Sequence, residues 1–311
     1  MAIPKSRIRN FLADTILFPA IALNLLAHGY AGFLSFLLGR RLSIRLFEFE
    51  DRARQKAVHR VVHTSTDGNC ESLLFHTPNI ICQSRAVTFS QKEPETLAWI
   101  DKYGGEGVFW DIGANIGLYS IYYAKTKPGP VFAFDPSVFN LEQLAKNVDK
   151  NGLYDRITIV PIALAEHTGI DSFSLSSLAT GAALSGFGTG SVHGFEILES
   201  IFRYRTVGVS GDDLIAKGLL PDTLPRLIKV DVDGIEHLIL AGMQNLLLAE
   251  ECRSVLVEVG ESSSTSAQYV KTIMIRSGFT LVGGNSHASD PELAVHWSGA
   301  NQLWVKEPSF E

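Results

Sequence analysis

The fold of this chain is decided by the stretch Val108-Phe109-Trp110-Asp111-Ile112-Gly113-Ala114-Asn115-Ile116-Gly117. An apolar strand ends in an acid, a tight glycine-containing loop follows at once, and a helix begins after it. In α/β proteins, this arrangement brings backbone amides and one carboxylate to a ligand at the carboxyl edge of a parallel sheet. The stretch therefore predicts a strand–loop–helix unit with a ligand site at its turn.

The spacing within the loop indicates which ligand it suits. A dinucleotide fingerprint reads G-x-G-x-x-G, and its second glycine lets the backbone approach a pyrophosphate. Counted from Gly113, that second position is Asn115. The pattern D-x-G-x-N-x-G instead suits a ligand that has no phosphates and carries an amino acid group and an adenosine. S-adenosylmethionine (SAM) is such a ligand.

Each position of the loop has an expected role in binding this cofactor. We expect Asp111 to orient the loop and to accept a hydrogen bond from the ligand's amino group. Gly113 and Gly117 allow close backbone approach and positive φ, and Ala114 lies between them. Asn115 can adopt the left-handed conformation and bond to neighbouring amides. The alternative is an ordinary strand–helix turn.

Apolar strands alternate with helices on both sides of this loop, which favours a parallel, doubly wound α/β sheet. Besides 107–111, strands are expected at 61–64, 72–76, 86–89, 131–135, 157–162, 227–231, 254–259, 279–282 and 302–306. Helices are expected at 42–60, 93–103, 118–126, 138–151, 234–249 and 266–277. Residues 166–206 are rich in Gly, Ser and Thr and interrupt the pattern, so this segment is expected to be a lid or a set of short extra strands.

Further acids follow the second and fourth of the strands that alternate with helices. Asp135 ends the second, where ribose-binding acids occur in nucleotide folds, and Pro136 sets the turn after it. A helix N-cap is the competing interpretation for Asp135. Ala163, near the end of the third strand, is expected on the adenine side of the cofactor.

Asp231 follows the fourth strand and is expected near the methyl group and the acceptor, as a base, a hydroxyl ligand or a helix cap. Glu236 and His237 are the other catalytic candidates. The first helical turn would also favour acids at Asp233 and Glu236 through the helix dipole. No metal-ligand spacing is specific, although Asp231, Asp233 and Glu236 together offer oxygen ligands for a divalent cation.

Together these motifs resemble the FkbM family of SAM-dependent methyltransferases over roughly residues 90–285. The resemblance is carried by Asp111–Gly117, Ala133-Phe134-Asp135-Pro136, Ser210-Gly211-Asp212-Asp213-Leu214 and Ile228-Lys229-Val230-Asp231-Val232-Asp233-Gly234-Ile235-Glu236. Asp135 and Asp233 stand where Glu is commoner in the family. The resemblance implies a class I methyltransferase fold with a mostly parallel seven-stranded sheet. It also implies methyl transfer to an oxygen, often on a sugar, glycolipid or polyketide-like acceptor.

The N-terminal region has a different character from the rest of the chain. Residues 1–60 hold ten Lys and Arg against four Asp and Glu, and residues 11–39 are apolar and long enough to cross a bilayer. We expect a helical extension over 1–60 and the methyltransferase domain over 61–311. Basic flanks would keep that domain cytoplasmic. A surface-lying hairpin and helices packed on the domain are the alternatives to a membrane span.

Composition restricts the partners. The net charge of -6 argues against nucleic acid as the main partner. The three cysteines show no zinc spacing. The expected partner is therefore a small-molecule, glycan-linked or lipid-linked acceptor. The competing functions are an NAD-linked oxidoreductase, against which Asn115 argues, and a non-catalytic membrane-tethered module that keeps the fold.

Overall fold

The computed structural model describes residues 29, 40–188, 191–192, 195–196, 200–220, 224–259, 265–284, 287–288 and 301–306. The chain forms two compact units, Met1–Ala57 and Val58–Glu311. In the first unit, the described secondary structure extends over helix α2 (Arg40–Lys56). The helix expected to reach Arg60 ends at Lys56, because Val58 already begins strand β1 (Val58–Thr64).

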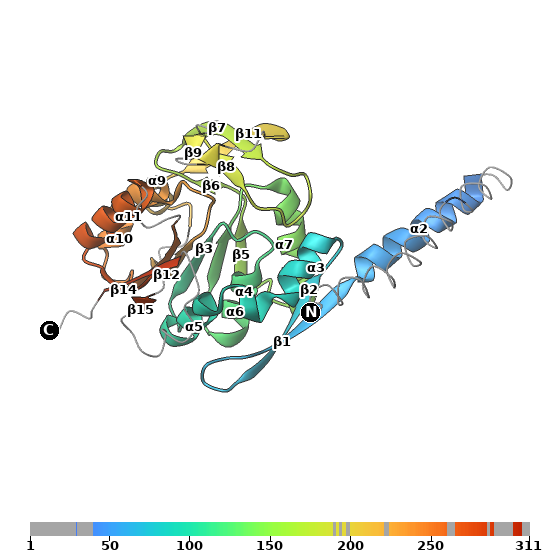
Figure 1. The fold of residues 1–311 in the computed structure, drawn as a ribbon, viewed down its shortest axis with the longest axis horizontal. Coiled ribbons are helices and arrows are strands. Elements are labelled where there is room, and N and C mark those ends of the chain that lie inside the picture. The colour runs from blue at the N-terminus through green and yellow to red at the C-terminus, as the bar shows by residue number, and fades with distance from the viewer. Residues whose placement is uncertain are drawn as a thin grey trace, which may run out of the picture. The chain divides into compact units, whose positions relative to one another are not determined.

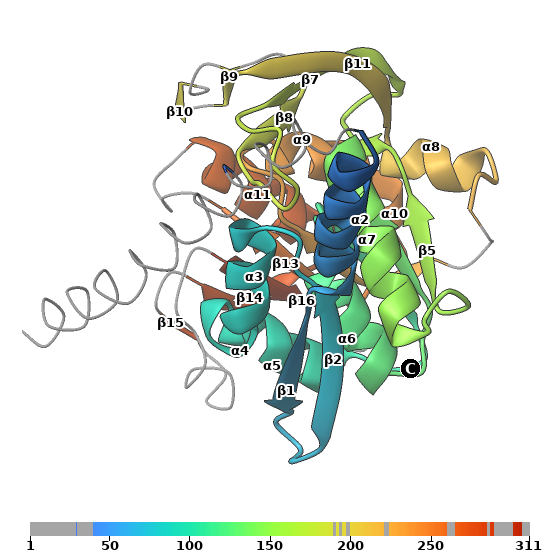
Figure 2. The ribbon, with the colours of Figure 1, turned by 90° about the vertical axis from the view of Figure 1, so that its right-hand side faces the viewer.

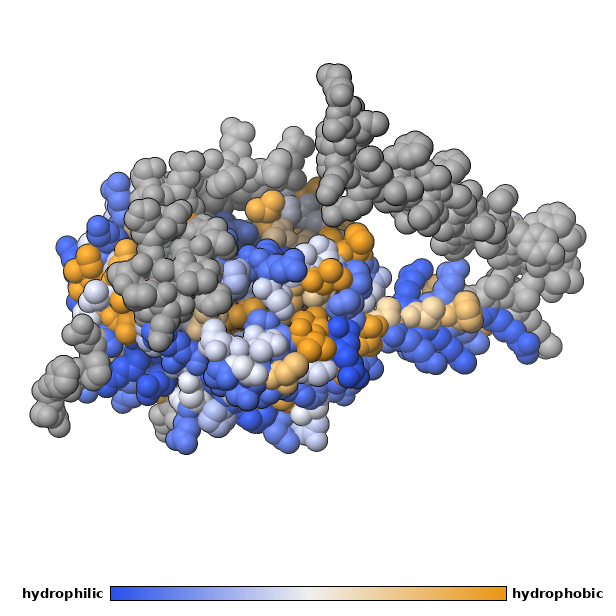
Figure 3. Space-filling model, turned by 60° about the horizontal axis from the view of Figure 1, so that its bottom comes forward, coloured by the Kyte–Doolittle hydropathy of each residue, from blue (hydrophilic) through white to orange (hydrophobic). Residues whose placement is uncertain are grey.

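Helix α2 carries mostly hydrophilic residues with a narrow line of apolar ones (Figure 3). Ile44, Phe47 and Phe49 are exposed apolar side chains on it. No helix within the described residues combines the length and the apolar character that a bilayer crossing requires. The apolar segment 11–39 lies outside the described residues except for Gly29.

The second unit is built around one large sheet with the strand order β15-β14-β16-β13-β12-β3-β4-β5. Its strands are β3 (Val108–Ile112), β4 (Val131–Phe134), β5 (Ile157–Val160), β12 (Pro225–Val230), β13 (Ser254–Glu258), β14 (Thr280–Gly284), β15 (His287–Ala288) and β16 (Asn301–Val305). The five strands from β13 to β5 run parallel, whereas β16 pairs antiparallel with both β13 and β14. Apart from the two-residue β15, these strands form the mostly parallel seven-stranded sheet that the sequence predicts.

Helices cover both faces of this sheet (Figures 1 and 2). On one face, α5 (Pro94–Tyr103), α6 (Leu118–Thr126) and α7 (Val138–Asn151) pack against alternate strand residues such as Phe109 and Leu227. On the other face, α9 (Glu236–Ala241), α10 (Gln244–Leu248) and α11 (Thr265–Arg276) pack against the intervening residues, such as Trp110 and Ile228. The parallel strands are largely apolar, as expected of strands that lie between two hydrophobic cores.

The segment before the sheet differs from the expectation. Strands β1 and β2 (Cys70–His76) include the strands expected at 61–64 and 72–76, and they pair antiparallel, but the strand expected at 86–89 is wrong. Helices α3 (Ile80–Val87) and α4 (Phe89–Lys92) occupy that stretch. Asn79 caps α3 by accepting a hydrogen bond from Cys82 N at 2.8 Å. Cys82, Ala86 and Phe89 are buried at helical spacing, which a short strand assignment overlooks.

The segment 166–206 contributes to a second, smaller sheet, so its described part follows the interpretation as extra strands. The sheet has the order β6-β11-β7-β8, from β6 (Ala163–Leu164), β7 (Gly169–Leu175), β8 (Ser185–Phe187) and β11 (Phe202–Val209). Strands β9 (Ser191–Val192) and β10 (Phe195–Glu196) form a separate pair, and helix α8 (Gly211–Ala216) follows β11. In Figure 1 the small sheet lies above the carboxyl ends of β3 and β12.

The single helix expected over 234–249 is also wrong, since it divides into α9 and α10 at Gly242. A side chain at Gly242 would place its Cβ 2.2 Å from the carbonyl oxygen of Ala165. The chain is thus packed tightly between the helical layer and the start of the small sheet. Only glycine fits this contact, and the helix is interrupted there.

The chain order reverses between β3 and β12, which lie side by side at the centre of the large sheet. In open α/β sheets, ligands bind beyond the carboxyl ends of the strands at such a point. The two strand ends are in close contact here, because Asp231 N donates to Ile112 O at 3.0 Å. Gly113 has φ +82, and a Cβ there would lie 1.9 Å from the carbonyl oxygen of Asp231.

We therefore predict that Gly113→Ala destabilises the fold far more than Gly152→Ala. Gly152 also has a positive φ, at +65, but nothing lies within 4 Å of its Cβ position. Alanine at position 152 therefore loses only the free energy of the left-handed backbone, about 1–2 kcal/mol. At Gly113 the backbone clash adds to that cost. Urea unfolding of both variants measures the difference, and equal losses would show that the β3–β12 contact is looser than described.

Candidate functional site

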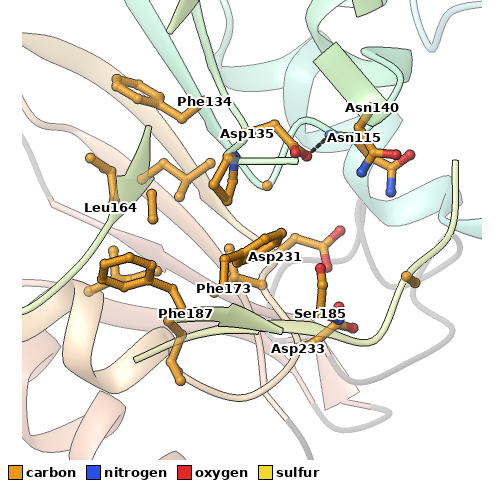
Figure 4. A pocket seen from close by; sticks show the side chains of 18 of the residues that line it. Asn115, Phe134, Asp135, Asn140, Leu164, Phe173, Ser185, Phe187, Asp231 and Asp233 are labelled. Atoms are coloured by element: carbon orange, nitrogen blue, oxygen red, sulfur yellow. Dashed lines mark hydrogen bonds between the residues drawn. The ribbon is translucent and has the colours of Figure 1, made fainter. Parts of the chain in front are cut away.

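A cavity of about 230 Å³ lies at the carboxyl ends of β3, β4 and β12 (Figure 4). Its walls come from the glycine loop, the ends of the parallel strands, the small sheet and helices α3 and α4. The lining residues are Arg85, Lys92, Ile112, Gly113, Asn115, Phe134, Asp135, Pro136, Asn140, Ile162, Ala163, Leu164, Phe173, Ala182, Ala183, Ser185, Phe187, Asp231, Val232, Asp233, Ile235, Ile239 and Glu258.

The polar and apolar side chains divide this cavity into two halves. Phe134, Leu164, Phe173 and Phe187 gather on one side of the view, whereas the polar side chains gather on the other (Figure 4). The labelled polar residues on that other side are Asn115, Asn140, Ser185 and Asp233. Asp135 lies between the two groups, so the cavity suits an elongated ligand with one flat apolar end and one charged end.

The glycine loop is fastened to the end of β4. Gly113 N and Ala114 N both donate to Phe134 O at 2.9 Å. Asn115 has φ 52, as its predicted left-handed conformation requires, and its backbone N donates to Asp135 Oδ2 at 2.9 Å. Its side-chain Oδ1 is buried and has no hydrogen-bond partner within the described part of the chain. An unpaired buried acceptor costs stability unless a ligand supplies the donor.

Asp135 connects the loop to helix α7. One carboxylate oxygen accepts from Asn115 N, and the other accepts from Ser137 N at 2.8 Å. The N-cap of α7 is Ser137 and not Asp135, so the competing helix-cap interpretation does not describe Asp135. Burial raises the pKa of Asp135 to about 7, although these backbone hydrogen bonds favour its charged form.

Asp111, Ala114 and Gly117 lie behind the loop surface, since they are not among the lining residues. Asp111 is 1% exposed and accepts from Ser120 Oγ at 2.5 Å. Burial raises the pKa of Asp111, and the charge of Lys229 opposes this shift. The direct contact of Asp111 with a ligand amino group stays a prediction, and the structure shows the residue supporting helix α6.

Next to the cavity wall, a buried lysine lies among several acids. Lys229 is 2% exposed, forms an ion pair with Asp231, and lies 3.8 Å from Glu93 Oε2. Its Nζ also lies 4.8 Å from the centre of the Tyr119 ring. Burial disfavours the ammonium charge, but Asp231 and Glu93 outweigh it and raise the pKa of Lys229.

Asp231 and Glu258 are joined by a side-chain hydrogen bond at the cavity wall. Burial opposes the charge of Asp231, yet Lys229 and a hydrogen bond from Glu258 hold the pKa of Asp231 well below its usual range. The same hydrogen bond, together with the charge of Asp231 and burial, raises the pKa of Glu258. The pKa values of the two carboxyl groups therefore shift in opposite directions, that of Asp231 downward and that of Glu258 upward.

The other catalytic candidates lie differently. Asp233 lines the cavity and accepts from Ser185 N at 3.0 Å. Glu236 is buried and accepts from Gly234 N at 2.7 Å at the start of α9. His237 stacks on Tyr269, with its Nδ1 2.9 Å from Ser266 Oγ. Neither Glu236 nor His237 lines the cavity, and their catalytic roles stay predictions.

Ala163 and Pro136 line the cavity as the sequence suggested, but Ala163 begins β6 and does not end β5. Other lining residues were missed: Arg85 and Lys92 precede the loop by more than 20 residues, and Phe173, Phe187 and residues 182–183 belong to the interrupting segment. In the sequence, only the unusual length of the segment 166–206 indicated that it contributes to the site. Within the described residues, no group of three or more His, Cys, Asp and Glu is placed to hold a metal ion, and this includes the acids after β12.

We predict that Lys229→Met costs about 3–5 kcal/mol of stability at pH 7, because it leaves buried carboxylates without a counter-ion. In the wild type, the depressed pKa of Asp231 keeps its stabilisation nearly complete above the unfolded value of about 4, so this contribution changes little between pH 4 and 7. In the variant, burial without a counter-ion raises the pKa of these carboxylates, so they take up protons in the folded state and the cost should shrink as the pH falls toward 4. Urea unfolding from pH 4 to 7 measures this. Lys92→Met, at an exposed lysine, is the control, and a pH-independent loss in Lys229→Met would contradict the charge argument.

Comparison with known proteins identifies relatives of this chain. The chain is 33% identical over 156 residues to the hexuronic acid methyltransferase AglP of Haloferax volcanii, a match that covers 50% of this chain and 56% of that protein. It is 26% identical over 204 residues to the 31-O-demethyl-FK506 methyltransferase FkbM of Streptomyces tacrolimicus, covering 56% of this chain and 73% of that protein. The chain thus spans little more than half the length of the first of these relatives.

Among solved structures, a methyltransferase FkbM from Methylobacillus flagellatus is similar with a TM-score of 0.40 and 18% identity, over 65% of this chain and 44% of that one. Residues 111–281, more than half of the chain, match the methyltransferase FkbM domain. This match begins at the first acid of the glycine loop and ends in β14, so it includes the strand ends that form most of the cavity. The chain belongs to the methyltransferase FkbM domain family.

Proposed function

We propose that this protein is a SAM-dependent methyltransferase that methylates a hydroxyl oxygen on a sugar, glycolipid or polyketide-like small molecule. The carrying observation is a cavity with an apolar half, a polar half and a carboxylate between them, at the switch point of a sheet whose residues match the FkbM domain. The names of the two relatives, one acting on hexuronic acid and one on a polyketide oxygen, support the acceptor class.

The residues present fit this cofactor. The apolar half, with Phe134, Leu164 and Ala163, would hold the adenine, since flat aromatic and aliphatic surfaces bind such rings by burial. Asp135 would accept from the ribose hydroxyls, which need an acceptor-only group. The polar half would hold the amino acid group, and the unpaired Asn115 Oδ1 offers it a hydrogen-bond acceptor. When bound, the cofactor supplies an electrophilic methyl group on a sulfonium.

The chain's own residues would then position the acceptor. Methyl transfer is an in-line displacement, and it gains mainly from orientation. The hydroxyl oxygen would gain the methyl group, the sulfonium would become a neutral thioether, and the hydroxyl proton would leave to water. Asp231, which lines the cavity, would orient the hydroxyl by accepting its hydrogen bond, because the low pKa of this carboxylate makes it a weak base. Glu258 is hydrogen-bonded to Asp231, and this contact raises the pKa of Glu258.

The finer partner assignments belong to the same proposal. The acceptor is a small molecule or a glycan- or lipid-linked group, and Arg85 and Lys92 on the cavity wall make a purely apolar acceptor less suitable. Membrane contact through residues 11–39 and a cytoplasmic location stay predictions.

Calorimetry with SAM, its demethylated product and NAD tests the cofactor, and transfer of a labelled methyl group to fractionated glycans and lipids tests the reaction. Binding of NAD alone would overturn the proposal.

Asp231→Asn should lower kcat by about 10- to 100-fold, the range for loss of a charged hydrogen bond to the acceptor hydroxyl, while the SAM affinity changes little. His237→Ala is the matched control, because its ring packs against α11. A comparable loss of kcat in His237→Ala would show that His237 takes part in the reaction.

The pKa of Asp135 near 7 predicts a pH-dependent affinity for the adenosine part of the cofactor. Ribose hydroxyls donate to the ionised carboxylate, so the affinity should rise about tenfold from pH 6 to pH 8 and then level off. The probe is 5′-methylthioadenosine, because it keeps the ribose but lacks the amino group that titrates in the same range. Asp135→Asn should bind more weakly and without this pH dependence. A flat profile in the wild type would contradict the ribose contact.

A further inference from the structure

Arg85 reaches the cavity from helix α3, which lies outside the residues that match the FkbM domain. Its side chain is half-buried, and its Nε donates to Gly181 O at 2.7 Å. The two Nη groups make no hydrogen bond or ion pair within the described part of the chain. The Nε hydrogen bond thus holds the guanidinium in place, and the four N–H donors of its two Nη groups are unused.

The position of this guanidinium is fixed by a short strap of residues 180–183. Several side chains bind the strap backbone. Asn79 Nδ2 donates to Thr180 O at 3.0 Å, Arg85 to Gly181 O and Asn115 Nδ2 to Ala182 O at 2.9 Å, while Asn140 Oδ1 accepts from Gly181 N at 3.0 Å. Arg85 and Asn115 therefore hold the carbonyls of successive residues. This places the guanidinium beside the glycine loop, in the polar half of the cavity.

The polar half also offers an anion at a separate place. Asp233 lines the cavity, and the charge of Arg85 acts on it to lower its pKa, against the upward shift caused by burial. The two side chains form no ion pair with each other, although both face the same space. A cation and an anion held apart in this way complement a ligand end that itself carries one carboxylate and one ammonium.

We propose that Arg85 binds the α-carboxylate of the cofactor's amino acid group, with Asp233 facing its ammonium. The proposal rests on the SAM site described above and adds a residue from outside the matched domain. A guanidinium fork binds a carboxylate through two parallel hydrogen bonds, which fixes the direction of the ligand as well as its affinity. Lys92, the other cation on the cavity wall, is exposed and lies 3.2 Å from Glu93 Oε1, so it does not fill this role.

The test compares SAM with decarboxylated SAM, which lacks only the carboxylate, by calorimetry on the full chain. Arg85→Met should weaken SAM binding by about 10- to 100-fold, the range for a charged hydrogen bond, and should leave decarboxylated SAM unchanged. Arg85→Lys keeps the charge without the fork, and it should show a smaller loss for SAM alone. Lys146→Met, at an exposed lysine of α7 that does not line the cavity, is the matched control and should bind both ligands as the wild type does.

The pairing of ligands separates a binding role from a structural one. If Arg85 only supports the strap, both ligands weaken together, because Ala182 and Ala183 line the same cavity, and the proposal is overturned. Unchanged SAM affinity in both Arg85 variants, with a raised KM for acidic acceptors, assigns the guanidinium to the acceptor and also overturns it. Failure of the wild type to bind either ligand would overturn the proposed function itself.

Discussion

The close backbone contact between the ends of β3 and β12 is the constraint on which the site depends. Gly113 leaves room for the carbonyl of Asp231, and Asp231 N donates to Ile112 O. This contact sets the glycine loop and the Asp231 carboxylate side by side, although more than 110 residues separate them along the chain. A side chain at Gly113 would force the two strand ends apart and would disturb the cavity wall that they form together.

Charge is distributed around this contact so that burial does not act alone on each acid. Lys229 is buried beside Asp231 and Glu93, and its charge lowers the pKa of Asp231 against the effect of burial. A hydrogen bond to Asp231 raises the pKa of Glu258, while burial brings the pKa of Asp135 to about 7. The cavity thus contains acids whose pKa values are shifted in opposite directions, and such an arrangement is typical of catalytic sites.

The small sheet and the helices before β3 complete the cavity with parts that the family match does not wholly include. Phe173 and Phe187 supply apolar wall from β7 and β8, and Arg85 supplies a guanidinium from α3. The strap at 180–183 joins these parts to the glycine loop through Asn115. The strap therefore connects these walls of the cavity to the glycine loop, so a change in the strap acts on both.

The sequence by itself determined the large sheet, the glycine loop and the acids at the strand ends. These features arise from local patterns: apolar runs, helical spacing and glycines that only certain turns require. Only the tertiary structure decided which of the acids face the cavity. Asp111 and Glu236 satisfy backbone or hydroxyl donors elsewhere, whereas Asp135, Asp231 and Asp233 line the wall. The sequence did not indicate a role for Arg85, because its place in the cavity wall depends on a hydrogen bond to Gly181, 96 positions away. No local periodicity predicts such a contact.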